Sequence, residues 1–314
     1  MSPARLLGRR LSNFLQTALL LAAMALLAGY LGWALLGGDG LVAAAVAALL
    51  LFALAPRVSP RMLLRLSGAT ELSPEQAPGL YRLLDALSQR AGLERVPRLF
   101  YLPTRVLNAF AVGHRDDAAI TVTDGLLRRL DSREIAGVLA HELAHVRSND
   151  VWVMTLADLV GRITGTLSFF GLALLFIWLP ISLFSGGGFP LLPILVMIFA
   201  PTISAMLQLA LSRTREYDAD IAAVELTGDP RGLASALDTL ERLQGGWMER
   251  LFMARVPKWL RTHPHTHERV RRLLELEGER PASRDEVASW AEDPFFGRPR
   301  IERAPRWHWS GLWY

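Results

Sequence analysis

Long apolar stretches alternate with polar segments along this chain of 314 residues. Asn13 to Trp33 is apolar and carries no charge, and Leu41 to Ala55 follows after a short polar break at residues 37–40. Ile163 to Phe184 and Leu191 to Leu211 form a second pair of such stretches. Because about 20 apolar residues in a helix cross a bilayer core, the pattern predicts four membrane spans in two hairpins.

The second stretch is short for a span, which leaves two interpretations. Either its helix runs on through Val58 while the Arg57 side chain reaches back to the membrane surface, or the segment is re-entrant. We favour a span. The first stretch could instead be a cleaved signal peptide, but its apolar core is too long for one and no clear cleavage site precedes the second stretch.

Arginines mark the ends of the apolar stretches on one side only. They lie before the first stretch, after the second and after the fourth: Arg5, Arg9, Arg10, Arg57, Arg61, Arg65, Arg213 and Arg215. The two hairpin turns contain neither arginine nor lysine. Since short cytoplasmic loops are enriched in these residues, we expect a multi-pass protein of the inner, cytoplasmic cell membrane, with the segment between the hairpins and both termini in the cytoplasm.

The polar segment between the hairpins has the periodicities of a small α+β domain. Pro74 to Leu93 carries apolar residues at helical spacing, which predicts an amphipathic helix. Three short β-type runs follow, at Arg98–Leu102, Val106–Val112 and Ala118–Val122, separated by turn residues. We therefore expect a small antiparallel sheet, whose edge can pair with an extended peptide.

A helix with a metal-binding pattern follows these runs. Asp131 and Glu134 form a capping-box start, and His141 and His145 lie four residues apart with Glu142 between them. One helical turn brings both imidazoles to a common point, where zinc takes nitrogen ligands at about 2.0–2.1 Å. Glu142 is then placed to act as the base that activates a water. The alternatives are chance and a pair of ordinary core histidines.

Two carboxylates follow the fourth apolar stretch. Leu211 to Leu226 predicts a helix that stops at residues 227–230, a Gly-then-Pro ending. Glu216 and Asp220 lie four residues apart on one face of it, so one can bind a metal while the other orients a ligand. Taken alone, this face is more typical of exposed ion pairs. A metal bound by His141 and His145 still needs a third protein ligand, and this need favours a metal-binding role for one of the two carboxylates.

Asp150, directly after the metal-binding helix, has two interpretations. Its carboxylate can accept a hydrogen bond from a ligand histidine or from a nearby arginine. It can also be a plain helix-end residue. The sequence leaves both open.

Composition narrows the chemistry. Hydrophobic residues make up 51% of the chain, which is high for a soluble protein and agrees with membrane spans. There is no cysteine, so disulfides are excluded and any zinc rests on His, Asp and Glu side chains. The net charge of +4 comes with arginines near span ends, which suit anionic lipid head groups, so no nucleic-acid partner is needed to explain it.

At four places the sequence resembles the HtpX family of membrane zinc peptidases, relatives of the CAAX prenyl endopeptidases. The matching runs stand in the family's order, among matching apolar stretches: Asn108–Ala111, His141–His145, Ser212–Asp220 and Thr262–Pro264. The resemblance covers about residues 10–275. It implies an α-helical membrane protein whose four spans carry a mainly helical α+β catalytic domain of the gluzincin type.

The resemblance also implies roles for individual residues. His141, His145 and Glu216 would bind one Zn²⁺ per chain, and Asp220 would orient His141. Glu142 would activate the water as general base and later protonate the leaving amine.

Three further assignments come from the resemblance alone. His263 and Arg269 would stabilise the oxyanion of the tetrahedral intermediate, and Asn108 would contact the substrate backbone. His263 has the close neighbours His265 and His267, so a plain His-rich surface run is the alternative for it.

This interpretation divides the chain into five segments. They are the N-terminal tail with the first hairpin (1–58), the first part of the catalytic domain (59–157), the second hairpin (158–212), the second part of the catalytic domain (213–280) and a tail rich in Trp, Arg and Pro (281–314).

The predicted function is a zinc-dependent endopeptidase that cuts polypeptides, chiefly membrane proteins, at the cytoplasmic membrane face. The family resemblance implies a role in protein quality control. The alternatives are a CAAX-type prenyl-protein endopeptidase and a non-catalytic membrane scaffold with a structural metal. The sequence leaves open the substrate, the oligomeric state and the role of the tail. His and Glu ligands would also accept cobalt or manganese in place of zinc.

Overall fold

The computed structural model describes residues 3–54, 61, 64–65, 67–185, 191–244 and 266–277. His263 and the tail from residue 281 onward lie outside the described residues. The chain separates into two compact units, one formed by residues 1–57 with 152–214 and the other by residues 58–151 with 215–314.

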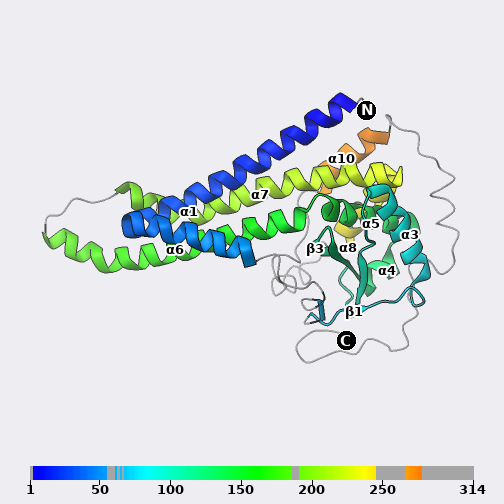
Figure 1. Cartoon of the computed structure of the whole chain (residues 1–314), viewed down its shortest axis with the longest axis horizontal. Helices are drawn as coiled ribbons and strands as arrows, with labels where there is room; N and C mark the ends of the chain where they lie inside the picture. Colours follow the sequence, from blue (N-terminus) through cyan, green and yellow to red (C-terminus); the bar gives the residue numbers. More distant parts are fainter. Residues whose placement is uncertain are drawn as a thin grey trace. The chain divides into compact units, whose positions relative to one another are not determined.

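The first unit is built from long apolar helices (Figure 1). They are α1 (Pro3–Leu54), α6 (Asp150–Ser185) and α7 (Leu191–Thr227), of which the last turns of α7 belong to the second unit. Among the described residues, three helical segments are long and apolar enough to cross a membrane: Phe14–Leu50, Asp150–Ile177 and Leu192–Thr227. The chain is therefore a multi-pass membrane protein.

Helix α1 is a helical hairpin, drawn as two blue arms in Figure 1. Its backbone leaves the helical conformation at Gly37, with φ 63° and ψ −140°. This region of φ favours glycine, because a Cβ atom would clash there. The arms approach closely just beside the break, since a Cβ atom added to Gly32 would lie 2.5 Å from the carbonyl oxygen of Gly40. The polar break predicted at residues 37–40 is thus the turn of the hairpin.

Side chains in this unit are arranged as a lipid environment requires. Large apolar side chains are exposed, among them Phe14, Leu19, Leu26, Phe169, Phe176, Leu192 and Met206. The interior includes four small polar side chains: Thr17, Thr164, Ser168 and Ser204. The Thr164 hydroxyl donates to the carbonyl of Val160 on the same helix, and Ser168 on α6 donates to the carbonyl of Met197 on α7. Membrane helices pack in this way because lipid tails are as apolar as the protein core.

The second unit combines helices with one small sheet. Its helices are α3 (Pro78–Ala91), α4 (Asp124–Arg129), α5 (Ser132–Arg147), α8 (Pro230–Gln244), α10 (Thr266–Glu277) and the end of α7. The amphipathic helix predicted between residues 74 and 93 is confirmed as α3. It begins with Pro78, whose missing N–H costs nothing in the first turn, and ends at Gly92 in the left-handed conformation.

The sheet is mixed, so the prediction of an antiparallel sheet was wrong. Its strands β1 (Thr70–Glu71), β2 (Arg98–Leu102), β3 (Ala109–His114) and β4 (Asp117–Thr123) stand in the order β1-β2-β4-β3. β3 and β4 form an antiparallel hairpin, but β4 pairs with β2 in parallel. Residues 103–108 carry the chain past the place beside β2, and β4 then fills that place. β3 is left as an edge strand.

Helix α5 lies in the core of the second unit and packs closely on α8. Its predicted capping box is confirmed: Asp131 accepts from the N–H of Glu134 at 2.8 Å, and Glu134 accepts from the N–H of Asp131 at 2.9 Å. The second oxygen of Glu134 accepts from the hydroxyl of Ser235 on α8 at 2.6 Å. A Cβ atom added to Gly137 would lie 2.8 Å from the backbone nitrogen of Leu233, so the two backbones approach closely there. The metal-binding helix is thus fixed at its start and along one face.

Candidate metal centre

Three side chains that can bind a metal converge from two helices of the second unit. α5 supplies His141 and His145, α7 supplies Glu216, and one ligand atom of each lies within 4.8 Å of the others. Nε2 of His141 lies 3.2 Å from Nε2 of His145 and 3.4 Å from Oε2 of Glu216, while Nε2 of His145 lies 3.8 Å from Oε1 of Glu216. The three side chains are only 4%, 12% and 9% exposed.

These separations fit a single zinc ion. Four ligands placed tetrahedrally at 2.0–2.1 Å from a zinc ion lie about 3.3 Å from one another, close to the spacings observed here. Two imidazole nitrogens and a carboxylate oxygen are ligands that zinc accepts in proteins. Among the described residues these three side chains form the ligand group, and three protein ligands leave a fourth position for a water or a substrate, as in catalytic zinc sites. The predicted group of His141, His145 and Glu216 is thus confirmed as the metal-binding group.

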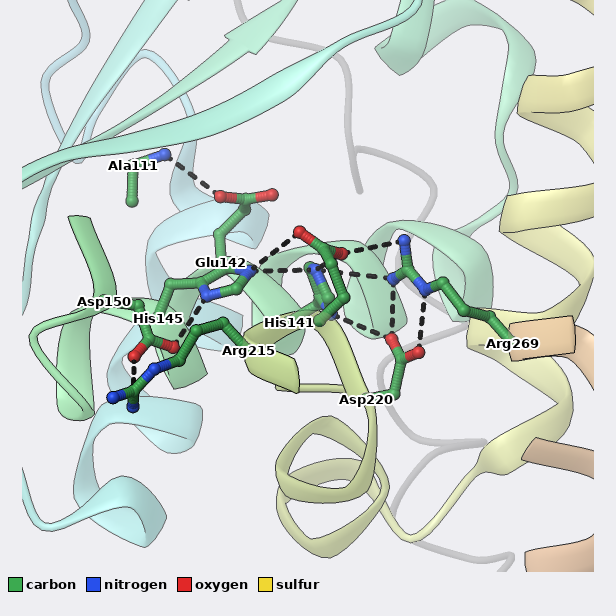
Figure 2. Close-up of polar contacts among 9 residues, drawn as sticks. Ala111, His141, Glu142, His145, Asp150, Arg215, Asp220 and Arg269 are labelled. Atoms are coloured by element: carbon green, nitrogen blue, oxygen red, sulfur yellow. Dashed lines mark hydrogen bonds and ion pairs between the residues drawn. The ribbon is translucent and has the colours of Figure 1, made fainter. Parts of the chain in front are cut away.

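A carboxylate and an arginine stand behind His141 (Figure 2). Oδ1 of Asp220 lies 3.1 Å from Nδ1 of His141. Arg269 of α10 donates two hydrogen bonds to Asp220, at 2.7 and 2.6 Å, and its Nη1 lies 2.9 Å from Oε2 of Glu216. Arg269 is only 1% exposed, so this charge is buried with its partners. A carboxylate on Nδ1 keeps the proton there and leaves Nε2 free for a metal.

The electrostatic environment of His141 favours positive charge. Burial lowers the pKa of His141, but Asp220 and Glu216 outweigh this effect and raise the pKa to about 9 without a metal. Burial also opposes charge on Arg269, yet Asp220 and Glu216 hold the pKa of Arg269 above its ordinary value. A pocket that stabilises a proton on a buried imidazole through two carboxylates also suits a divalent cation.

His145 has a similar pair of residues behind it. Oδ2 of Asp150 lies 3.0 Å from Nδ1 of His145, and Oδ1 accepts a hydrogen bond from Nη1 of Arg215 at 2.9 Å. Asp150 is 2% exposed. Of the two interpretations that the sequence leaves open, the structure therefore shows the contacts with a ligand histidine and with an arginine.

Glu142 lies between the metal-binding group and the edge strand. It is 4% exposed, and its Oε2 accepts a hydrogen bond of 3.0 Å from the backbone N–H of Ala111 on β3 (Figure 2). Hydrogen-bonded and non-hydrogen-bonded pairs alternate along an antiparallel ladder, and Asn108 is bonded to Thr123. Ala109 and Ala111 therefore direct their backbone groups away from β4, toward the edge of the sheet that no other described strand occupies.

The other three site residues predicted from the sequence differ in where they lie relative to the metal-binding group. Asn108 directly precedes β3, where its backbone exchanges hydrogen bonds with the Thr123 side chain. Arg269 lies at the site but is engaged by carboxylates, and His263 lies outside the described residues.

Sequence reasoning missed two contributors to the site. Arg215 could have been noticed as the arginine directly before the third ligand. Ala111 contributes its backbone N–H group. Every residue except proline has such a group, so the identity of the side chain could not have indicated this role.

Comparisons with known proteins agree with this site. The sequence model of peptidase family M48 matches residues 74–277. A protein of Burkholderia multivorans described as "Protease HtpX homolog" is 34% identical and covers 84% of this chain and 97% of its own length. A protein of Paraburkholderia phytofirmans with the same description is 35% identical, with the same coverage. The crystal structure of S. mikatae Ste24p aligns with a TM-score of 0.50 at 21% identity, over 85% of this chain and 67% of that one, which shows a shared fold.

Proposed function

This chain belongs to peptidase family M48, and on that premise we propose that it cuts polypeptides at the cytoplasmic face of the inner membrane, in membrane-protein quality control. As a member of the family it is a membrane-bound zinc metallopeptidase with the metal-binding group His141, His145 and Glu216. The proposal depends on one observation, the convergence of this group with Glu142 beside β3, the edge strand of the described sheet.

The metal, Glu142 and the backbone N–H of Ala111 have different roles in the proposed reaction. Zinc, when bound, supplies a Lewis acid and lowers the pKa of a coordinated water toward about 7. Glu142 accepts a proton from the attacking water on its carboxylate and passes it to the nitrogen of the leaving amine. The hydrogen bond from Ala111 keeps that carboxylate beside the metal-binding group. Since Glu142 is almost fully buried, little bulk water competes for the proton.

The edge strand β3 supports recognition of an extended substrate. Ala109 directs its backbone N–H and carbonyl outward, and Ala111 directs its carbonyl outward while its N–H is bonded to Glu142. A peptide can add to the sheet through such outward groups. Asn108, at the start of the strand, would contact the substrate backbone from one side. Only an extended segment can pair in this way, so unfolded or misassembled regions are favoured as substrates over folded domains.

Two residues are proposed to stabilise the oxyanion that forms during attack. Arg269 is one, because its buried guanidinium lies beside Glu216 and brings positive charge to the metal-binding group. In the same geometry it also positions Glu216 and Asp220. His263 is the other, from the family resemblance. Replacement of an oxyanion donor typically lowers turnover about a hundred- to a thousandfold. The His263→Ala variant should therefore cleave its substrate slowly while its zinc content stays that of the wild type.

The pattern of arginines supports the proposed orientation. With both arms of α1 and both α6 and α7 crossing, the chain crosses four times, so its two ends and the second unit lie on one side. That side carries the arginines next to the spans, and such residues are retained in the cytoplasm. Glu216 follows Leu211, the last residue of the fourth apolar stretch, by only five residues. Substrates would therefore be met close to the membrane.

The test compares the wild-type protein with Glu142→Gln, both purified in detergent. Zinc content and cleavage of casein, an unfolded substrate, are measured side by side. We expect about one zinc in each protein and cleavage by the wild type alone, because the glutamine keeps the shape of the side chain but cannot accept the proton. Zinc-loaded wild type that cuts neither casein nor an unfolded membrane protein would contradict the proposal.

The same preparation separates the alternatives. A prenylated C-terminal peptide added beside casein would be the preferred substrate of a prenyl-protein endopeptidase. A non-catalytic scaffold with a structural metal would keep its full function after the Glu142→Gln substitution, because it needs no general base. Within the part of the chain that the structure describes, the ligand group has three members, and this favours catalysis because structural zinc sites usually have four protein ligands.

A further inference from the structure

Each ligand histidine is backed by its own carboxylate–arginine pair, and the two pairs come from different parts of the chain. His141 has Asp220 with Arg269, and His145 has Asp150 with Arg215. The family resemblance assigns roles to both members of the first pair. The second pair has no assigned role, and Figure 2 shows it on the side of His145 away from Asp220.

Asp150 is held by contacts at both of its oxygens. Oδ2 lies 3.0 Å from Nδ1 of His145, and Oδ1 lies 2.9 Å from Nη1 of Arg215. The Asp150 side chain is 3% exposed and that of Arg215 is 14% exposed. A buried carboxylate is stable only when it is paired, so Arg215 makes the charge of Asp150 tolerable at this position.

The path of the backbone between α5 and α6 brings Asp150 next to the imidazole of His145. Helix α5 ends at Arg147, and α6 begins at Asp150 after a two-residue connection. Asn149 in this connection takes a left-handed conformation, with φ 54°, which asparagine tolerates better than most residues. Its side chain accepts a hydrogen bond of 3.2 Å from the N–H of Arg115. The tight turn thus brings the Asp150 carboxylate back to the ring of the preceding helix.

Arg215 connects this arrangement to the third ligand. It directly precedes Glu216 on α7, and neighbouring residues of a helix point about 100° apart. Glu216 can therefore face the metal-binding group while Arg215 reaches Asp150. A single ion pair restrains the ring of His145 and the turn of α7 that carries Glu216.

We propose that Asp150 and Arg215 are a positioning pair for the metal site. Asp150 keeps the proton of His145 on Nδ1 and directs Nε2 toward the metal, and Arg215 fixes Asp150 and the register of Glu216. The inference deepens the proposed function, because it concerns the same site. It is independent of the substrate, since metal affinity is measured without one.

The experiment compares Asp150→Ala, Asp150→Asn and Arg215→Gln with the wild-type protein in detergent. Zinc affinity is measured by competition with a chelator, and the unfolding temperature of the zinc-free protein is measured separately. Loss of an outer partner of a ligand histidine typically lowers metal affinity about 10- to 100-fold. We expect a loss of this size for Asp150→Ala. Smaller losses are expected for Asp150→Asn, which keeps an acceptor oxygen, and for Arg215→Gln. Excess zinc should restore the metal content of each variant.

Asp158→Asn is a matched control on the same helix. Asp158 also pairs with an arginine, Arg162, at 2.8 Å, but this pair is exposed and follows Asp150 by eight residues on α6. The Asp158→Asn variant should bind zinc with the same affinity as the wild-type protein. The proposal is overturned if the Asp150 and Arg215 variants keep wild-type zinc affinity while their zinc-free forms unfold at lower temperature, because the pair would then only fasten helices. If Asp150→Ala does not fold, the zinc affinities of Asp150→Asn and Arg215→Gln decide.

Discussion

The backbone N–H of Ala111 donates a hydrogen bond of 3.0 Å to Oε2 of Glu142, so the proposed general base is held by the edge strand of the sheet. The strand has a second use in the proposed mechanism, because its outward groups are those that an extended substrate would pair with. Positioning of the base and binding of the substrate therefore depend on neighbouring backbone groups of the same strand, β3.

Ala111→Pro removes this N–H group without breaking the pairing with β4. Proline is tolerated on an edge strand where the missing N–H faces outward. A hydrogen bond to a charged group contributes about 1.5–3 kcal/mol, so loss of the bond in the transition state should lower turnover about 10- to 150-fold. The measurement is casein cleavage at equal zinc content.

Ala111→Ser is the control, because it changes the side chain and keeps the N–H group. It should cleave at nearly the wild-type rate. Equal activity of the proline and serine variants would mean that the bond to Glu142 has no part in catalysis.

Zinc removal should destabilise the second unit, because the ligands bridge α5 and α7. A metal that binds only the native state stabilises it by about 2.7 kcal/mol at a free concentration of 100 Kd. We therefore expect chelation to lower the unfolding temperature of the wild type and of Glu142→Gln alike. Glu216→Ala, which lacks the ligand from α7, should show a much smaller shift. A shift of wild-type size in Glu216→Ala would remove Glu216 from the ligand set.

The features that follow from local geometry could be predicted from the sequence. His141 and His145 share a helix face because of their spacing, and the capping box at Asp131 and Glu134 fixes where that helix begins. Both depend on neighbours within one or two turns of the chain. The third ligand, Glu216, is 71 residues further along, and only the demand for another ligand together with the family resemblance selected it.

The features that depend on which elements become neighbours could not be predicted. The strand runs were visible, but the insertion of β4 between β2 and β3 depends on the path of residues 103–108. The same is true of the Asp150–Arg215 pair, which joins two helices 65 residues apart. Taken alone, Asp150 resembles an ordinary charge at a helix start, and Arg215 resembles an ordinary charge after an apolar stretch.

Gly137→Ala should destabilise the protein through the contact between α5 and α8. Its Cβ atom would lie 2.8 Å from the backbone nitrogen of Leu233, which cannot move as a side chain can. Overpacking of this kind costs about 1–3 kcal/mol, read as a lower unfolding temperature. Gly165→Ala on α6 is the control, because its Cβ atom would meet nothing within 4 Å. Equal effects at the two positions would show that helix propensity, and not the close approach, governs the result.

The absence of cysteine makes the proposed orientation directly measurable, because the native chain gives no background in thiol labelling. Asp39→Cys would place a thiol at the exposed turn of the α1 hairpin, and Gln89→Cys would place one on the exposed face of α3. If both arms of α1 span and the second unit is cytoplasmic, a membrane-impermeant maleimide should label Asp39→Cys in cells with a permeabilised outer envelope and an intact inner membrane. Gln89→Cys should react only after the inner membrane is opened. The reverse order would invert the topology, whereas protection of both thiols until the inner membrane is opened would show that the hairpin turns back within the bilayer.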